Sequence, residues 1–104
     1  MADARATIEK LINENPVVVF MKGTKNFPQC GFSSRAVEAL KRAGAEFETV
    51  NVLADADVRE AIKEYSQWPT IPQVYVDGKF VGGSDILLQL FESGELAKMV
   101  APKA

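Results

Sequence analysis

The chain has 104 residues, which fits one domain, and we expect that domain to span residues 1–104. Hydrophobic residues make up 47% and charged residues 25%, the balance of an ordinary globular protein. The net charge of −2 does not suggest nonspecific nucleic-acid binding, so we expect no nucleic-acid partner. The longest apolar run, 17–21, is far shorter than the roughly 20 residues that cross a bilayer, so we expect no membrane segment.

The chain contains one cysteine, Cys30, and no histidine. One cysteine excludes an internal disulfide framework. The absence of histidine excludes Ser–His and Cys–His catalytic pairs and the usual zinc sites built by one chain. The N-terminus has no apolar signal-peptide stretch, and Asp3 and Glu9 argue against an uncleaved transit peptide. We therefore expect a cytoplasmic protein or a processed organellar one.

The start of the chain predicts a helix, a strand and a loop. Apolar residues recur at helical spacing around Ile8, and Pro16 disfavours helix at Asn15, where we expect the first helix to end. The β-branched run at 17–21 predicts a strand that is covered on both faces. Glycine, asparagine and proline in the segment 22–29 predict a loop.

Two helices with a strand between them are predicted next. The second helix starts near Phe32, the first of several apolar residues at helical spacing, and Gly44 fits its C-terminal cap. Residues 47–52 predict a second strand. A third helix follows, with Asp55 or Asp57 as its N-cap.

A hairpin is predicted after the third helix. The segment 68–72 contains two prolines and is not expected to be helical. Val74 and Val76 then alternate with polar neighbours, which predicts a strand. The Asp77-Gly78 pair is a strong signal for a hairpin turn, after which the strand pattern resumes.

Two helices complete the predicted fold. Ser84 or Asp85 can cap a helix that carries Ile86 on its apolar face, and a short helix lies around 96–100. The strand–helix–strand unit gives a parallel pair and the hairpin an antiparallel pair. We therefore predict an α/β fold with a mixed four-stranded sheet and helices on both faces, which is a thioredoxin-like architecture.

Cys30 lies where the second predicted helix begins. A helix N-terminus carries partial positive charge and unpaired N–H groups, and both stabilise a thiolate. The segment 15–37 contains no acidic residue but has the cations Lys22, Lys25 and Arg35. The alternative is a buried structural cysteine, since free cysteines are often buried, and composition and position alone leave both interpretations open.

Residues 30–33 read Cys-Gly-Phe-Ser, which resembles the CGFS signature of monothiol glutaredoxins. Further blocks resemble that family in order and spacing: residues 21–24, 27–29, 68–73, 77–78 and 81–83. The resemblance covers nearly the whole chain, and the short N-terminus is similar to that of single-domain members. It implies a glutathione site and a labile, exchangeable [2Fe–2S] cluster.

The resemblance assigns one part of a glutathione site to residues on both sides of this signature. Lys22 and Arg59 resemble the family's pair for the glycine carboxylate, and solvated surface charge is the alternative for both. Thr70 and Ile71 precede Pro72, which the family holds in the cis form. That turn offers backbone groups for strand-like pairing with the tripeptide, and it is also compatible with a plain proline turn.

The second part of the implied site follows the hairpin. Gly83 lets the backbone come close to a ligand. Ser84 and Asp85 open a helix whose N–H groups suit the γ-glutamyl carboxylate, while the Asp85 carboxylate suits the ammonium; ordinary helix capping is the alternative. Many family members have a cysteine in place of Ser84, and some have phenylalanine in place of Ile71. A disulfide from Cys30 to position 84 is therefore excluded, and we expect slightly different packing of the pocket.

Ser33 stands where a C-x-x-C motif has its second cysteine, so Cys30 cannot complete a two-cysteine redox cycle within one chain. A [2Fe–2S] cluster typically takes four ligands, usually thiolates, and two chains with two glutathiones supply four. This agrees with what the resemblance implies: a homodimer that carries the cluster to iron–sulfur recipient apoproteins, with Cys30 as its redox-active thiol and metal ligand.

Two other functions would use the same cysteine. A glutathione-dependent thiol–disulfide oxidoreductase would use Cys30 for deglutathionylation. The seven residues between Lys22 and Cys30 disfavour fast exchange by family analogy, because dithiol glutaredoxins have a much shorter spacing, so we expect weak activity. An adaptor in iron sensing would pair with a BolA-type protein, which could contribute the histidine or cysteine ligand that this chain lacks.

Overall fold

The computed structural model describes residues 3–101. The predicted domain 1–104 also includes residues 1–2 and 102–104, which lie outside the described residues. The elements in chain order are α1 (Ala4–Glu14), β1 (Val17–Met21), α2 (Gly31–Arg42), β2 (Glu48–Asn51), α3 (Ala56–Ser66), β3 (Gln73–Val76), β4 (Lys79–Gly82), α4 (Ser84–Glu92) and α5 (Glu95–Val100). None of these helices has the length and apolar character needed to cross a membrane.

The strands form one mixed sheet in the order β2-β1-β3-β4. β1 pairs in parallel with β2 and antiparallel with β3, and β3 pairs antiparallel with β4. The β3–β4 turn contains Asp77 and Gly78, whose φ angles are +51° and +81°, as a two-residue hairpin turn of type I′ requires. The predicted α/β fold with a mixed four-stranded sheet is therefore confirmed.

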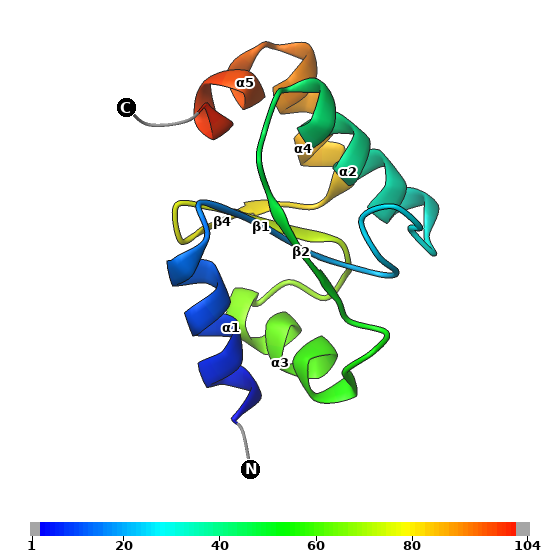
Figure 1. Cartoon of the computed structure of the whole chain (residues 1–104), viewed down its shortest axis with the longest axis vertical. Helices are drawn as coiled ribbons and strands as arrows, with labels where there is room; N and C mark the ends of the chain where they lie inside the picture. The colour runs from blue at the N-terminus through cyan, green and yellow to red at the C-terminus, as the bar shows by residue number, and fades with distance from the viewer. Residues whose placement is uncertain (1–2, 102–104) are drawn as a thin grey trace.

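Helices cover both faces of the sheet. α1 and α3 lie on one face, and α2, α4 and α5 lie on the other (Figure 1). Every residue of β1 is buried, as the apolar run predicted. Val19 packs with Leu40 and Leu87 in one core cluster, while Phe20 packs with Ile62 in the second cluster on the opposite face. β1 thus separates the two halves of the core.

β3 is also buried along its whole length, including the polar residues that alternate with its valines. Gln73 is 0% exposed and Tyr75 is 2% exposed. The ring of Tyr75 lies edge-on to Phe20, with centroids 5.7 Å apart, and packs beside Phe80 at 5.4 Å. The face of β3 that carries its polar side chains therefore belongs to the core under α1 and α3.

The first turns of α2 and α4 are more exposed than helical spacing predicted, and the N-cap of α4 differs from the predicted one. Phe32 and Ile86, which helical spacing placed on apolar faces, are 53% and 39% exposed, because each lies in the first turn of a helix that opens onto a pocket. The N-cap of α4 is Gly83, so neither Ser84 nor Asp85 caps it; both belong to the helix, and no side chain bonds its cap.

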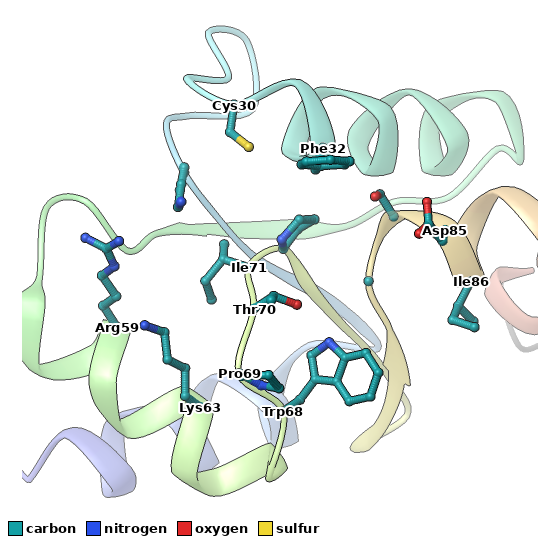
Figure 2. A pocket seen from close by; sticks show the side chains of 14 residues that line it. Cys30, Phe32, Arg59, Lys63, Trp68, Pro69, Thr70, Ile71, Asp85 and Ile86 are labelled. Atoms are coloured by element: carbon teal, nitrogen blue, oxygen red, sulfur yellow. The ribbon is translucent and has the colours of Figure 1, made fainter.

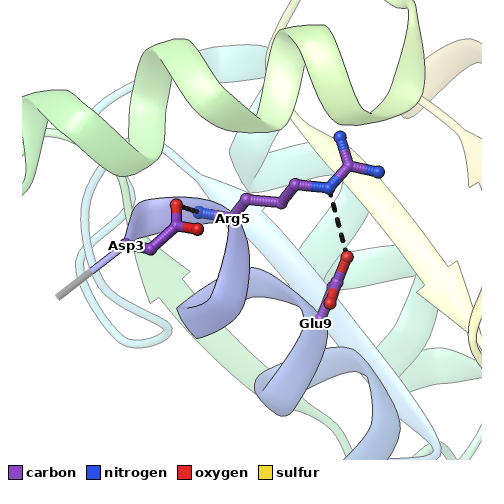
Figure 3. Close-up of polar contacts among 3 residues, drawn as sticks. All are labelled: Asp3, Arg5 and Glu9. Atoms are coloured by element: carbon purple, nitrogen blue, oxygen red, sulfur yellow. Dashed lines mark hydrogen bonds and ion pairs between the residues drawn. The ribbon is translucent and has the colours of Figure 1, made fainter.

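The start of α1 is anchored to α3. The Asp3 carboxylate accepts a hydrogen bond of 3.0 Å from the N–H of Arg5, and the Arg5 Nε lies 3.2 Å from a carboxylate oxygen of Glu9 (Figure 3). The Arg5 guanidinium lies 5.2 Å from the ring centroid of Tyr65 on α3. The ion pair with Glu9 is exposed, so it contributes little to the free energy of folding. The contact of Arg5 with the Tyr65 ring joins α1 to α3.

The N-cap of α3 is Asp55, whose carboxylate accepts hydrogen bonds of 3.1 Å from the N–H groups of Asp57 and Val58. Asp55→Ala removes both bonds and is expected to lower the free energy of unfolding by about 1 kcal/mol, measured by urea denaturation. Asp55→Asn keeps a capping oxygen and should unfold close to the wild type. Equal losses in the two variants would contradict the capping role.

Candidate functional site

A pocket of about 440 Å³ lies where the sequence places Cys30. Its wall comes from the β1–α2 connection, α3, the loop before β3 and the start of α4 (Figure 2). All of the predicted site residues line it: Lys22, Cys30, Arg59, Thr70, Ile71, Pro72, Gly83, Ser84 and Asp85. The fold thus brings segments from most of the chain to one place. Which chemical group each of these residues binds stays a prediction.

Cys30 is the N-cap of α2, and its partly exposed thiol faces this pocket (Figure 2). The backbone N–H of Ser33 is the main cause of the lowered pKa of the Cys30 thiol, and partial burial opposes it. The N–H of Phe32, the charge of Lys22 and the Ser33 hydroxyl lower the pKa further. The positive end of α2 therefore favours the thiolate, the form that acts as nucleophile and metal ligand.

The loop between β1 and α2 is fixed at several points. The N–H of Gly23 donates to the Asn51 side chain at 3.0 Å, and the Lys25 ammonium donates to the carbonyl of Phe47 at 2.6 Å. A Cβ on Gly23, which has φ +94°, would lie 2.5 Å from the backbone nitrogen of Gln29. Only glycine fits there, and the loop that leads to the thiol is held against β2.

Ser33 is fully buried one turn after Cys30. Its hydroxyl oxygen accepts a hydrogen bond of 3.1 Å from the N–H of Lys22. The hydroxyl at the second-cysteine position therefore ties the start of α2 to the end of β1. A serine at this place supports the position of Cys30 and cannot form a disulfide with it.

The α3 side of the pocket is positively charged. Arg59 and Lys63 lie one helical turn apart on α3 (Figure 2), and Lys22, which follows β1, lines the same pocket. The Arg59 Nε is buried and has no hydrogen-bond partner among residues 3–101. Lys63 lies 3.6 Å from a carboxylate oxygen of Glu60, which is largely exposed. Asp85 is the acidic residue in the lining, so the pocket has excess positive charge suited to carboxylates.

The loop before β3 forms the floor of the pocket. The Ile71–Pro72 peptide bond is cis. The backbone N–H and C=O of Ile71 have no hydrogen-bond partner among residues 3–101, so both can pair with a ligand. A Cβ on Gly83 would lie 3.2 Å from the carbonyl of Pro72, so Gly83 allows this loop and the start of α4 to approach closely.

The structure adds five lining residues that the sequence prediction did not include: Phe32, Lys63, Trp68, Pro69 and Ile86. Lys63 had a signal, because it follows Arg59 by one helical turn on the polar face of α3. Trp68 and Pro69 belong to the proline-rich segment. Phe32 and Ile86 had the helical spacing of core residues, so no sequence signal separated them from the core.

The glutaredoxin family model matches residues 17–81. A ycf64-like monothiol glutaredoxin of Synechocystis sp. is 58% identical over 98 residues, which cover 94% of this chain and 92% of that protein. The chain belongs to the monothiol glutaredoxin family. The resemblance found in the sequence is thereby confirmed. Chloroplastic and mitochondrial monothiol glutaredoxins also match, so the comparisons do not favour one compartment for this glutaredoxin.

Solved structures share the fold of this glutaredoxin. The solution structure of reduced poplar apo GrxS14 has a TM-score of 0.81 and 51% identity, over 92% of this chain and 88% of that one. The crystal structure of a buckwheat glutaredoxin–glutathione complex has a TM-score of 0.82 and 29% identity, over 93% of this chain and 86% of that one. The thioredoxin-like architecture predicted from the sequence is confirmed.

The lowered pKa of Cys30 predicts the pH dependence of its alkylation. Because the thiolate reacts, the rate with iodoacetamide should reach half its maximum at a lower pH in the folded protein than in the urea-unfolded chain, whose thiol has an ordinary pKa of about 8.5. Lys22→Met should shift the folded midpoint upward, since the charge of Lys22 lowers the pKa. Mass spectrometry of quenched samples gives the rates, and equal midpoints in folded and unfolded protein would contradict the role of the helix.

Proposed function

We propose that this glutaredoxin binds glutathione in the Cys30 pocket and holds a [2Fe–2S] cluster between two subunits, as cargo for transfer to iron–sulfur apoproteins. The observation that carries the proposal is a single thiol, favoured as thiolate, at the edge of a cationic pocket and with a buried serine in place of a second cysteine. A thiolate in this position can act as a ligand but cannot be resolved by its own chain.

Glutathione matches the chemistry along the pocket. Its glycine carboxylate suits Lys22 and Arg59, and the buried, unpaired Nε of Arg59 supports this placement. The free backbone groups of Ile71 suit strand-like pairing with the tripeptide, next to Thr70. A ligand held in this way would have its thiol beside Cys30. The structural neighbour from buckwheat is a complex with glutathione, which supports the same ligand class here.

The far end of the pocket suits the other end of glutathione. The first turn of α4 has no side-chain cap, so the N–H groups before Leu87, whose own N–H donates to the Gly83 carbonyl, can bind the γ-glutamyl carboxylate. The exposed Asp85 carboxylate can pair with the ammonium. Gly83 keeps the start of α4 close to Pro72, so this end of the pocket adjoins the loop that carries Ile71.

In this proposal a second copy of the chain completes the cluster site. One chain offers one cysteine and no histidine, so two Cys30 thiolates and two glutathione thiolates complete the usual four ligands. Phe32, Trp68 and Ile86 leave apolar surface exposed around the pocket. A homodimer would cover this surface and shield the cluster from water.

Thiol exchange with glutathionylated proteins is the second candidate, and the lowered pKa of Cys30 favours it. A BolA-type partner in place of one subunit is a further proposal that keeps the same cluster position. Localisation in the cytoplasm stays a prediction.

Anaerobic reconstitution with iron, sulfide and glutathione separates the cluster carrier from the thiol oxidoreductase. A carrier gives a glutathione-dependent [2Fe–2S] spectrum on a dimer, whereas an oxidoreductase remains a colourless monomer that is active with glutathione.

Cys30→Ser should abolish the cluster and any thiol activity, because it removes the only thiolate of the chain. The measurement is the visible spectrum and the size-exclusion mass after reconstitution. Ser34→Ala, an exposed change in the same helical turn, is the matched control and should assemble like the wild type. A [2Fe–2S] spectrum in the Cys30 variant would refute the ligand assignment.

Arg59→Gln should raise the glutathione concentration that gives half-maximal cluster formation by about tenfold, because a charge-assisted hydrogen bond to a carboxylate is lost. The titration is followed by visible absorbance. Arg35→Gln is the control: its guanidinium lies 5.7 Å from the ring centroid of Phe32 and does not line the pocket. An equal effect of the two substitutions would show that only the overall charge matters.

A further inference from the structure

Gln73, the first residue of β3, is fully buried and bonds with its side chain to the loop that forms the pocket floor. Its Nε2 donates to the carbonyl of Trp68 at 3.0 Å and to the carbonyl of Thr70 at 3.2 Å. Its Oε1 accepts a hydrogen bond of 3.3 Å from the hydroxyl of Tyr75. One buried carboxamide thus joins the core of the sheet to two residues that line the pocket.

Only a carboxamide of this length satisfies these partners. The two carbonyls can only accept, so they require the NH₂ group, and the side-chain oxygen then faces Tyr75. Burial raises the pKa of Tyr75 to about 12, against a smaller lowering by the Ser66 hydroxyl, so the phenol keeps its proton and donates. A carboxylate at position 73 could not donate to either carbonyl, and an apolar side chain would leave both without this partner.

The loop is also tied to the end of α3. The N–H of Trp68 donates to the carbonyl of Lys63 at 3.2 Å and to the Ser66 hydroxyl at 3.1 Å. The Trp68 ring packs beside Phe80, with centroids 5.9 Å apart. These contacts hold residue 68, whereas the Thr70 carbonyl is held by the hydrogen bond that it accepts from Gln73. Gln73 therefore fixes the part of the loop that leads directly to Ile71.

We propose that Gln73 is a positioning residue for glutathione: by fixing the carbonyls of Trp68 and Thr70, it sets the loop so that the Ile71 backbone meets the tripeptide beside Cys30. The inference rests on the proposed glutathione function. Gln73 lies under the loop and does not line the pocket, so it acts through Thr70 and Ile71 and not by contact.

Exchange of Cys30 with glutathione disulfide tests this role. The Cys30 thiolate attacks one sulfur, a Cys30–glutathione disulfide bond forms as the glutathione disulfide bond breaks, and one glutathione leaves as thiolate. The same exchange with bis(2-hydroxyethyl) disulfide uses the same thiol but a leaving group without the tripeptide. Mass spectrometry gives both equilibrium constants, and their ratio is the glutathione preference, in which changes at the thiol itself cancel.

Gln73→Met should lower the glutathione preference about tenfold, since two hydrogen bonds that fix the loop are lost. Tyr75→Phe is the matched control: it removes the bond to Oε1 but keeps both bonds to the loop, so the preference should stay within about twofold. Thermal unfolding midpoints are measured alongside, because either variant can be destabilised. Gln73→Leu, which cannot donate in any protonation state, should reproduce the loss and serves if the methionine variant fails to fold.

An unchanged preference in the position-73 variants, with a lowered unfolding midpoint, would overturn the positioning role and leave Gln73 a purely structural residue. A preference that falls equally in Tyr75→Phe would also overturn it, since core disruption would then explain the effect. A wild-type protein without any preference for glutathione would instead refute the proposed glutathione function, and the positioning role with it.

Discussion

The burial of β1 between two helical layers is the constraint on which the rest of this glutaredoxin depends. All of its side chains are in the core, and it pairs with β2 on one side and β3 on the other. Its carboxyl end is therefore fixed in space. The loop that begins at Lys22 and leads to Cys30 starts from that end and is held by a hydrogen bond to Asn51. In open α/β sheets ligands bind outside the carboxyl ends of strands, and the pocket here follows that rule.

The pocket is positively charged although the whole chain has a negative net charge. The chain has a net charge of −2, yet Lys22, Arg59 and Lys63 face one pocket together with the positive end of α2. Each of these cations comes from an element held by the core, so the charges do not need to assemble when an anion arrives. Such preorganisation reduces the free energy that binding would otherwise spend on ordering side chains.

Features that depend on residues close together in the sequence could be predicted from it. The apolar run of β1, the Asp77-Gly78 turn and the motif at Cys30 predicted the strand, the hairpin and the helix start, and the structure agrees. Phe32 and Ile86 could not be placed from spacing, because helical periodicity does not show where a pocket interrupts the core. The role of Gln73 was equally hidden: a polar residue next to Val74 carries no sign that a loop carbonyl from another segment needs a donor.

Trp68 is the only tryptophan of the chain, and it lies on the rim of the pocket with its ring beside Phe80. Indole emission depends on the polarity and the mobility of its surroundings. The position of this one ring therefore gives the protein an intrinsic optical reporter, whose signal comes from the ligand-facing loop alone and not from an average over several sites. Occupation of the pocket, or approach of a second chain to the same rim, would be recorded by the native sequence without any label.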